Sequence, residues 1–119
     1  MSKKITLIFR HAPHGSAACR EALDFALLSA SFEQQISLLF VDEGVLNLLD
    51  AQLPELIGGR DFIKTLKALP LYEIDEVYAC QDSLAKRGLN QLPASLAVDL
   101  LDTNAIKALL SQADEVLVY

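Results

Sequence analysis

The sequence predicts an α/β fold: a single domain, 1–119, with a five-stranded, mostly parallel sheet and helices on both faces. Two observations lead to this prediction. Short apolar runs rich in β-forming residues alternate along the chain with segments of helical pattern, as in βαβ units. These runs show little polar alternation, which is expected when helices cover both faces of a sheet. A length of 119 residues fits one domain, and no repeat or linker divides it.

The first half of the chain begins with a predicted strand over 5–9, a short apolar run rich in β-forming residues. Ser16 is a suitable N-cap, so we predict a helix over 17–30. A second strand is predicted over 36–41, where almost every residue is apolar. A leucine-rich stretch over 45–49 follows. The order of strand, helix and strand is that of a βαβ unit.

The second half repeats this alternation. A helical segment over 61–69 stops at Pro70, because proline cannot continue a helix. The third strand is predicted over 76–80, and a short helix over 82–87 is closed by Gly88, a natural residue for a helix C-terminus. The remaining elements are a strand over 96–100, a helix from 102 or 103 to about 112, and a strand over 116–119.

The simplest arrangement of these strands is the flavodoxin-like order 2-1-3-4-5. In such a sheet, ligands bind beyond the carboxyl ends of the strands, at the point where the strand order reverses. We therefore expect the loop after the first strand, with His11, His14 and Gly15, to lie opposite Cys80 at the end of the third strand. This arrangement would bring a candidate nucleophile close to the two histidines of the chain.

Cys80 is the candidate catalytic residue. It precedes a predicted helix, whose N-terminal N–H groups stabilise the thiolate form that accepts sulfur. Asp82 opposes this effect, since a nearby carboxylate disfavours a second negative charge. Lys86 and Arg87 follow about two turns later, too far to help directly. We favour the interpretation of Cys80 as an inert, buried thiol over that of a reactive one.

Composition and charge restrict the partners. The formal net charge of −6 disfavours direct binding to nucleic acid or to an anionic membrane. Apolar residues make up 52% of the chain, more than a small domain usually buries alone, so we expect contacts with other subunits. The candidate interface segments are 17–30 and 45–57, with a well-covered interior as an equal alternative. No signal peptide or membrane span is expected, which favours the cytoplasm.

We expect no metal and no cofactor. His11 and His14 lack neighbouring ligands, and the spacing of Cys19 and Cys80 matches no zinc motif. The loop that ends at Gly15 lacks both the dinucleotide fingerprint and the P-loop lysine. The start of the following helix could still hold an anion. The histidines are interpreted as loop or subunit-contact residues in preference to acid–base groups.

Several segments together resemble the TusC/DsrF branch of the DsrE/DsrF-like proteins. The similarity extends over the whole chain and includes its length and the placement of its strands. The segments that carry it are Ala-Pro-His-Gly at 12–15, Arg-Glu-Ala-Leu-Asp at 20–24, Arg-Asp-Phe at 60–62, Leu-Tyr at 71–72 and residues 80–88.

The resemblance implies a DsrE/F-like fold and a subunit that assembles with TusB-like and TusD-like proteins in a heterohexamer holding two copies of each. TusA-like and TusE-like proteins would be transient partners in passing sulfur towards the wobble uridine of tRNA. The family's recognised sulfur-carrying cysteine belongs to the TusD-like subunit. Cys80 looks positionally similar to it, but residues 81–83 replace small apolar residues, so the resemblance implies a structural, non-catalytic subunit.

Three hypotheses therefore stay open for the function of the chain. It is a structural partner in a sulfur-relay complex, which we favour. Alternatively, it is itself a sulfurtransferase that carries a persulfide on Cys80, or it is a flavodoxin-like module that binds a nucleotide or anion beside Gly15. The relay could serve tRNA thiolation or, as for DsrF-like subunits, sulfur oxidation.

Overall fold

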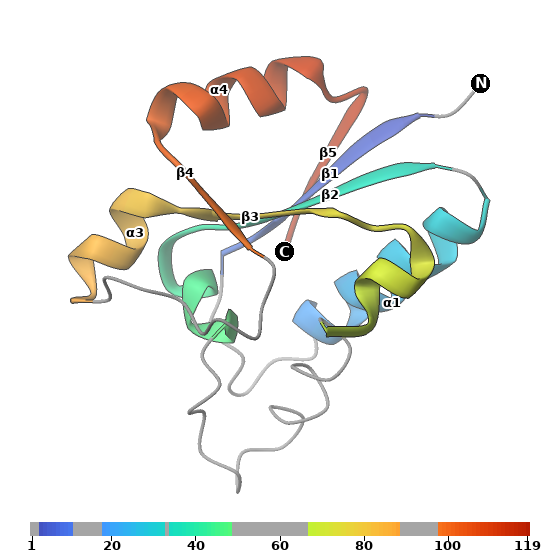
Figure 1. Ribbon diagram of the computed structural model, residues 1–119, viewed down its shortest axis with the longest axis horizontal. Coiled ribbons are helices and arrows are strands. Elements are labelled where there is room, and N and C mark those ends of the chain that lie inside the picture. Colours follow the sequence, from blue (N-terminus) through green and yellow to red (C-terminus); the bar gives the residue numbers. More distant parts are fainter. Residues whose placement is uncertain (1–2, 11–17, 33, 49–66, 89–97) are drawn as a thin grey trace, which may run out of the picture.

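A sheet of five parallel strands forms the centre of the molecule (Figure 1). The computed structural model describes residues 3–10, 18–32, 34–48, 67–88 and 98–119. All four strand pairings are parallel, so the α/β class and the parallel sheet predicted from the sequence are confirmed. The strands are β1 (Lys4–Phe9), β2 (Gln35–Phe40), β3 (Glu76–Cys80), β4 (Asp99–Leu101) and β5 (Glu115–Val118).

The predicted strand order was wrong. The strands lie in the order β4-β3-β2-β1-β5, so β2 separates β1 from β3. The physical reason is visible in the burial of β2: all five residues from Ile36 to Phe40 are buried, which an edge strand could not achieve. The order 2-1-3-4-5 would have placed this strand at an edge. Consecutive strands β1 to β4 instead lie side by side, and β5 returns to the free side of β1.

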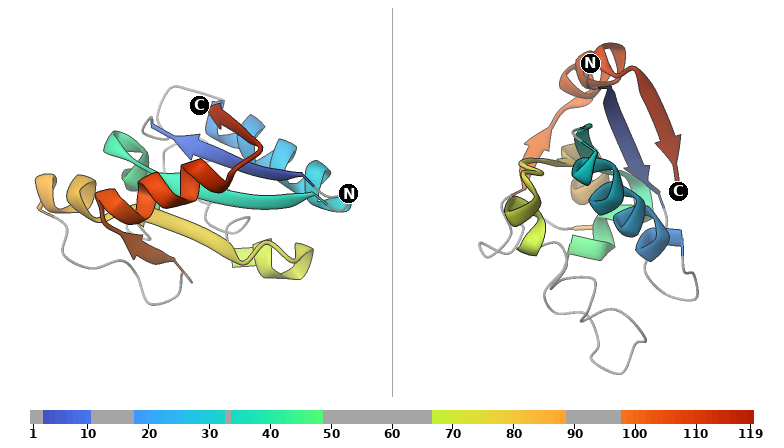
Figure 2. Two further views of the ribbon diagram at one scale, coloured as in Figure 1. Left: turned by 90° about the horizontal axis from the view of Figure 1, so that it is seen from above. Right: turned by 90° about the vertical axis from the view of Figure 1, so that its right-hand side faces the viewer.

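Helices cover both faces of the sheet, as predicted (Figures 1 and 2). One face carries α1 (Ala18–Ser31) and the short 3-10 helices η1 (Asp42–Leu48) and η2 (Leu69–Tyr72). The opposite face carries α4 (Thr103–Gln112), which connects β4 to β5 across the sheet. The short helix α3 (Gln81–Lys86) follows β3 directly. The helix predicted over 61–69 lies mostly outside the described residues, and β4 begins at Asp99 instead of 96.

The face under α1, here the α1 face, carries the main core. Phe9 and Phe40 stack there with ring centroids 4.6 Å apart. Val45 and Leu48 of η1 are fully buried in the same core, so they belong to the interior and not to an interface. The other buried apolar residues of this core include Ile5, Leu7, Ala26, Ile36, Leu38, Leu69, Ile74, Val77, Ala79 and Leu84.

The face under α4, here the α4 face, is more polar. Leu39 and Leu109 are buried outside the main core. Thr6 and Ser37 are opposite each other on β1 and β2, and both are fully buried. Neither hydroxyl oxygen has a hydrogen-bond partner among the described residues. A buried hydroxyl without a partner lowers the stability of a fold.

We predict that Thr6→Val stabilises the protein. Valine has the shape of threonine without the hydroxyl, so the substitution removes a buried polar group and leaves no cavity. The free energy of unfolding should rise by about 1 kcal/mol, measured by urea denaturation. A loss of stability would instead mean that the hydroxyl of Thr6 is hydrogen-bonded in solution.

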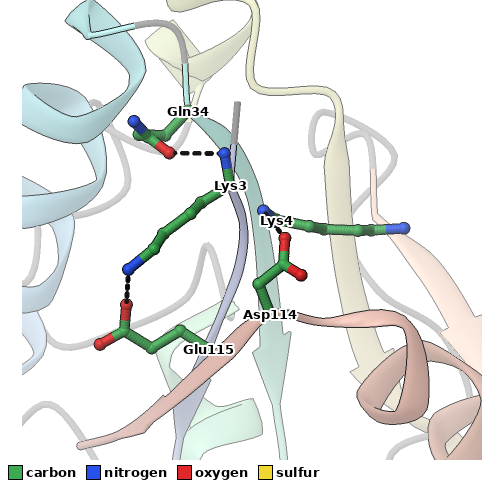
Figure 3. A network of polar contacts seen from close by, with 5 residues as sticks. All are labelled: Lys3, Lys4, Gln34, Asp114 and Glu115. Carbon is green, nitrogen blue, oxygen red and sulfur yellow. Dashed lines mark hydrogen bonds and ion pairs between the residues drawn. The ribbon is translucent and has the colours of Figure 1, made fainter. Parts of the chain in front are cut away.

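The amino end of the sheet is fixed by a polar network that joins β1 to β2 and β5 (Figure 3). The backbone N–H of Lys3 donates to Gln34 Oε1 at 2.8 Å. The backbone N–H of Lys4 donates to Asp114 Oδ2 at 2.8 Å, and the N–H of Asp114 donates back to the Lys4 carbonyl at 2.7 Å. Lys3 also pairs with Glu115 at 3.6 Å. This network sets the register of β5 beside β1.

Candidate functional site at the end of strand β3

Cys80 is the last residue of β3 and the N-cap of α3. Its backbone is extended, with φ −73° and ψ 117°, and its thiol is free and half-buried. The local structure predicted for Cys80, a strand end before a helix, is therefore present. Because β1, β2 and β3 are parallel, their carboxyl ends lie at one edge of the sheet, and η1, which follows β2, contacts α3.

The side chain of Cys80 belongs to the α4 face, because residues alternate along a strand and Cys80 has the parity of Tyr78 and Glu76. Its register partner on β4 is Leu101, and that of Tyr78 is Asp99. Among the described residues, no hydrogen bond or ion pair joins the Cys80 thiol to a basic side chain. The electrostatic support that usually favours a reactive thiolate is thus absent from the described part of the site.

Two basic residues, Lys86 and Arg87, lie at the end of α3. Arg87 donates from its guanidinium to the Ser83 carbonyl at 3.1 Å and so binds the last turn of α3. Lys86 is exposed in that same turn. Both residues lie at the end of the helix opposite to Cys80, in agreement with the distance expected from the sequence.

Asp82 is held by α4. Thr103 Oγ1 donates a hydrogen bond to Asp82 Oδ2 at 3.3 Å, and this contact joins the first turn of α3 to the first turn of α4. Asp102 caps α4 by accepting from the Ala105 N–H at 2.8 Å. The carboxylate two residues after Cys80 therefore has a structural partner, and it adds a negative charge to the site without a described cation to balance it.

The start of α3 is joined to η1 by a part-buried hydrogen bond. The N–H of Asp42 donates to the hydroxyl of Ser83 at 2.8 Å, and Ser83 is 5% exposed. Asp42 has a left-handed backbone with φ 51°, a conformation that aspartate adopts more readily than most residues. Its exposed carboxylate pairs with Arg10 at 3.8 Å, a contact of small energetic weight. Ser83 and Asp42 thus position the strand ends.

No sequence pattern singled out Ser83 and Asp42 for this role. They are 41 residues apart and meet only because β2 lies beside β3. A usable signal was the position of Asp42 directly after a buried strand, where polar residues at the edge of a parallel sheet gather.

The expected approach of His11 and His14 to Cys80 depended on β1 lying beside β3. With β2 between them, the backbones of β1 and β3 are roughly 10 Å apart, which is twice the spacing of neighbouring strands. The prediction that β1 lies beside β3 was therefore wrong. His11, His14 and Gly15 lie outside the described residues, and so does the side chain of Cys19.

Tyr78 lies on the α4 face, and its surroundings change the pKa of its hydroxyl. Its hydroxyl donates to Glu76 Oε1 at 3.2 Å. Burial raises the pKa of Tyr78 above its ordinary value of 10.0, and the negative charge of Glu76 adds to this shift, with a smaller contribution from Asp99. The phenol therefore remains protonated to higher pH in the folded state than in the unfolded state.

We predict a pH dependence from this shift. Above pH 10.0 the unfolded chain loses the Tyr78 proton more readily than the folded chain, so the folded state binds more protons and stability falls as pH rises through the folded pKa. Wild type should lose stability more steeply in this range than Tyr78→Phe, measured by urea denaturation at several pH values. Equal slopes for the two proteins would contradict the raised pKa.

In the described ranges, no group of three or more His, Cys, Asp or Glu side chains could hold a metal ion. The helices of those ranges also include none with the length and apolar character required to cross a membrane. The described part of the site contains the Cys80 thiol, the Ser83 hydroxyl and the Asp82 carboxylate.

The chain belongs to the DsrE/DsrF-like family, whose pattern matches residues 3–119. Within that family it is similar to proteins named TusC. It is 41% identical over 116 residues to protein TusC of Klebsiella pneumoniae, and 34% identical over 116 residues to the TusC homologue of Aliivibrio fischeri. These alignments cover 97% and 98% of this chain, respectively, and 98% of each relative.

Solved structures support the fold independently. The YchN protein of E. coli is similar with a TM-score of 0.79 at 22% identity, over 98% of this chain and 99% of that one. A conserved protein of unknown function from Bacteroides thetaiotaomicron has a TM-score of 0.71 at 14% identity, over 98% of this chain and 95% of that one. At these identities the similarity establishes the fold alone.

Proposed function

We propose that the chain is a structural subunit of a cytoplasmic sulfur-relay complex, in which a different subunit carries the sulfur. The observation that supports this most is its similarity to TusC proteins over nearly the full length of both chains. The surroundings of Cys80 support the second half of the proposal. Asp82 lies two residues away, and the described residues provide no cation that would stabilise a thiolate or persulfide.

In this proposal the partners are TusB-like and TusD-like subunits, two copies of each in a heterohexamer with this chain. Sulfur enters from a TusA-like donor and leaves through a TusE-like carrier towards the wobble uridine of tRNA. The net charge of −6 is in keeping with a chain that contacts protein partners and leaves tRNA binding to another component.

Co-purification followed by native mass spectrometry tests this proposal. The chain should be expressed together with TusB-like and TusD-like subunits from the same organism, with an affinity tag on this chain alone. We expect one complex containing two copies of each subunit. A monodisperse monomer with no affinity for either subunit would contradict the proposal.

The second candidate function is a sulfurtransferase that uses Cys80. The half-buried thiol at the start of α3 favours it. In this reaction the Cys80 thiolate attacks the outer sulfur of a donor persulfide, which gives a Cys80 persulfide and releases the donor thiolate. Intact-mass measurement after incubation with a cysteine desulfurase and a TusA-like donor would then show a gain of one sulfur atom that Cys80→Ala abolishes. We expect no such gain.

A further inference from the structure

Four of the large exposed apolar side chains of the described residues come from the end of α1 and from η2. Leu28 and Phe32 are one turn apart at the end of α1, and they are 60% and 69% exposed. Leu71 and Tyr72 of η2 are 84% and 48% exposed. The two elements contact each other, and the right-hand view of Figure 2 shows them on the same side of the sheet. We refer to Leu28, Phe32, Leu71 and Tyr72 as the apolar patch.

The elements that carry the patch are anchored in the main core. Leu69 of η2 is 1% exposed and Ala26 of α1 is fully buried, whereas other residues of both elements are exposed. Side chains of this size cost free energy when water surrounds them. A cluster of such residues on one surface is typical of a site for protein contact.

An acidic hollow adjoins the patch and indicates what kind of surface would cover it. The hollow has a volume of about 450 Å³ and lies between the end of α1 and the segment that leads from η2 into β3. Glu73, Asp75 and Glu76 are among its lining residues, and none of the described lining residues is basic. Tyr72 belongs to both the hollow and the patch. The described lining is completed by Ala30, Gln34, Gln35 and Ile36.

This charge distribution disfavours a second copy of the chain as the occupant. A two-fold interface centred on the patch would bring two acidic hollows towards each other, and like charges across an interface repel. The net charge of −6 on each copy adds to the repulsion. A partner with basic side chains beside an apolar centre would satisfy both the patch and the hollow.

We propose that the apolar patch and its acidic hollow form the docking surface for a different protein subunit. The contact surface of that subunit carries apolar side chains that cover Phe32 and Leu71, and a Lys or Arg that enters the hollow. The choice of subunit for the test rests on the proposed function, whereas the location of the surface follows from the exposed residues and their charge.

The test uses the co-expressed complex and two kinds of variant. Phe32→Ser combined with Leu71→Ser removes the apolar contact, and Glu73→Lys combined with Asp75→Lys reverses the charge of the hollow. Both pairs are exposed, so the folded state should persist, which thermal unfolding checks. Val118→Ser on β5 is the matched control, because Val118 is an exposed apolar residue, 55% exposed, on a different element.

Each double variant should reduce the recovery of at least one partner subunit by roughly tenfold, as expected for the centre of an interface. Val118→Ser should recover both subunits as wild type does. Amide hydrogen exchange should slow in 28–32 and 69–76 when the complex forms.

Three outcomes would overturn the docking surface. If the double variants assemble as wild type does, the partner binds elsewhere and the proposed function is unaffected. If the isolated chain dimerises and Phe32→Ser abolishes the dimer, the occupant is a second copy. If wild type binds neither subunit, both the proposed function and the assigned occupant fail together.

Discussion

Gly44→Ala is expected to destabilise the protein by roughly 3 kcal/mol or more, the upper range for overpacking. Gly44 lies in η1 and contacts the backbone of β1. A Cβ atom at this position would lie 2.5 Å from the carbonyl carbon of Phe9 and closer still to its oxygen. The obstacle is backbone in a central strand, which cannot rotate away as a side chain could. The variant must therefore shift η1, and with it the hydrogen bond between Asp42 and Ser83.

Gly88→Ala provides the control. Gly88 has a φ of 71°, and a Cβ atom there would meet nothing within 4 Å. Alanine at this position should cost only about 1 kcal/mol, the usual penalty of a left-handed backbone. Urea denaturation followed by circular dichroism measures both variants. If Gly44→Ala were no more destabilising than Gly88→Ala, the close packing of η1 on β1 would be wrong.

Phe40→Ala is expected to destabilise the protein by about 3–5 kcal/mol, as for other buried phenylalanines truncated to alanine. Phe40 is fully buried at the carboxyl end of β2, where it stacks on Phe9. Its removal leaves a cavity directly beneath the strand ends that position α3. Both the lost burial and the cavity reduce the free energy of unfolding.

Phe32→Ala is the matched control for this substitution. The same side chain is removed, but Phe32 is 69% exposed, so stability should change by no more than about 0.5 kcal/mol. The same variant should impair assembly if the docking surface is correct. Thermal and urea unfolding of the two variants therefore separate residues that hold the fold from residues that bind a partner. Equal destabilisation by both would contradict the assignment of Phe40 to the core.

β1, β2, β3 and β5 could be predicted from sequence to within one residue at each end, because each is a short run of mostly apolar residues, whereas β4 begins three residues later than predicted. β3 matches its predicted range at both ends, 76–80. The strand order could not be predicted in the same way, because both orders satisfy short, right-handed crossovers. The unbroken burial of Ile36–Phe40 distinguishes a central from an edge position, but the apolar run over 36–41 was compatible with either before burial was known.

The position of Cys80 could also be predicted, since it depends only on a strand end followed by a helix. The contacts around it could not. The bond between Asp42 and Ser83 requires the correct neighbour for β3, and the bond between Asp82 and Thr103 requires that α4 begin beside α3. Both are tertiary contacts between segments distant in the sequence, so no local sequence pattern predicts them.

The apolar residues of the chain lie partly in the interior and partly on the surface. Val45 and Leu48 are in the main core, whereas Leu28 is exposed on α1 two residues after the buried Ala26. The sequence pattern of 17–30 was apolar on more than one face and therefore compatible with both locations. The position of η2 helps to decide which residues of α1 are exposed, because η2 contacts α1. It also adds Leu71 and Tyr72 to the exposed apolar surface.

A structural role without sulfur transfer is tested most directly in a reconstituted relay. Persulfide delivery to a TusE-like carrier should be measured with three samples. These are the complete complex, the complex with Cys80→Ala, and the TusB-like and TusD-like subunits without this chain. The proposal predicts that Cys80→Ala transfers sulfur within about twofold of the wild-type rate, whereas omission of the chain abolishes transfer. Loss of transfer in Cys80→Ala as complete as in the omission would contradict it.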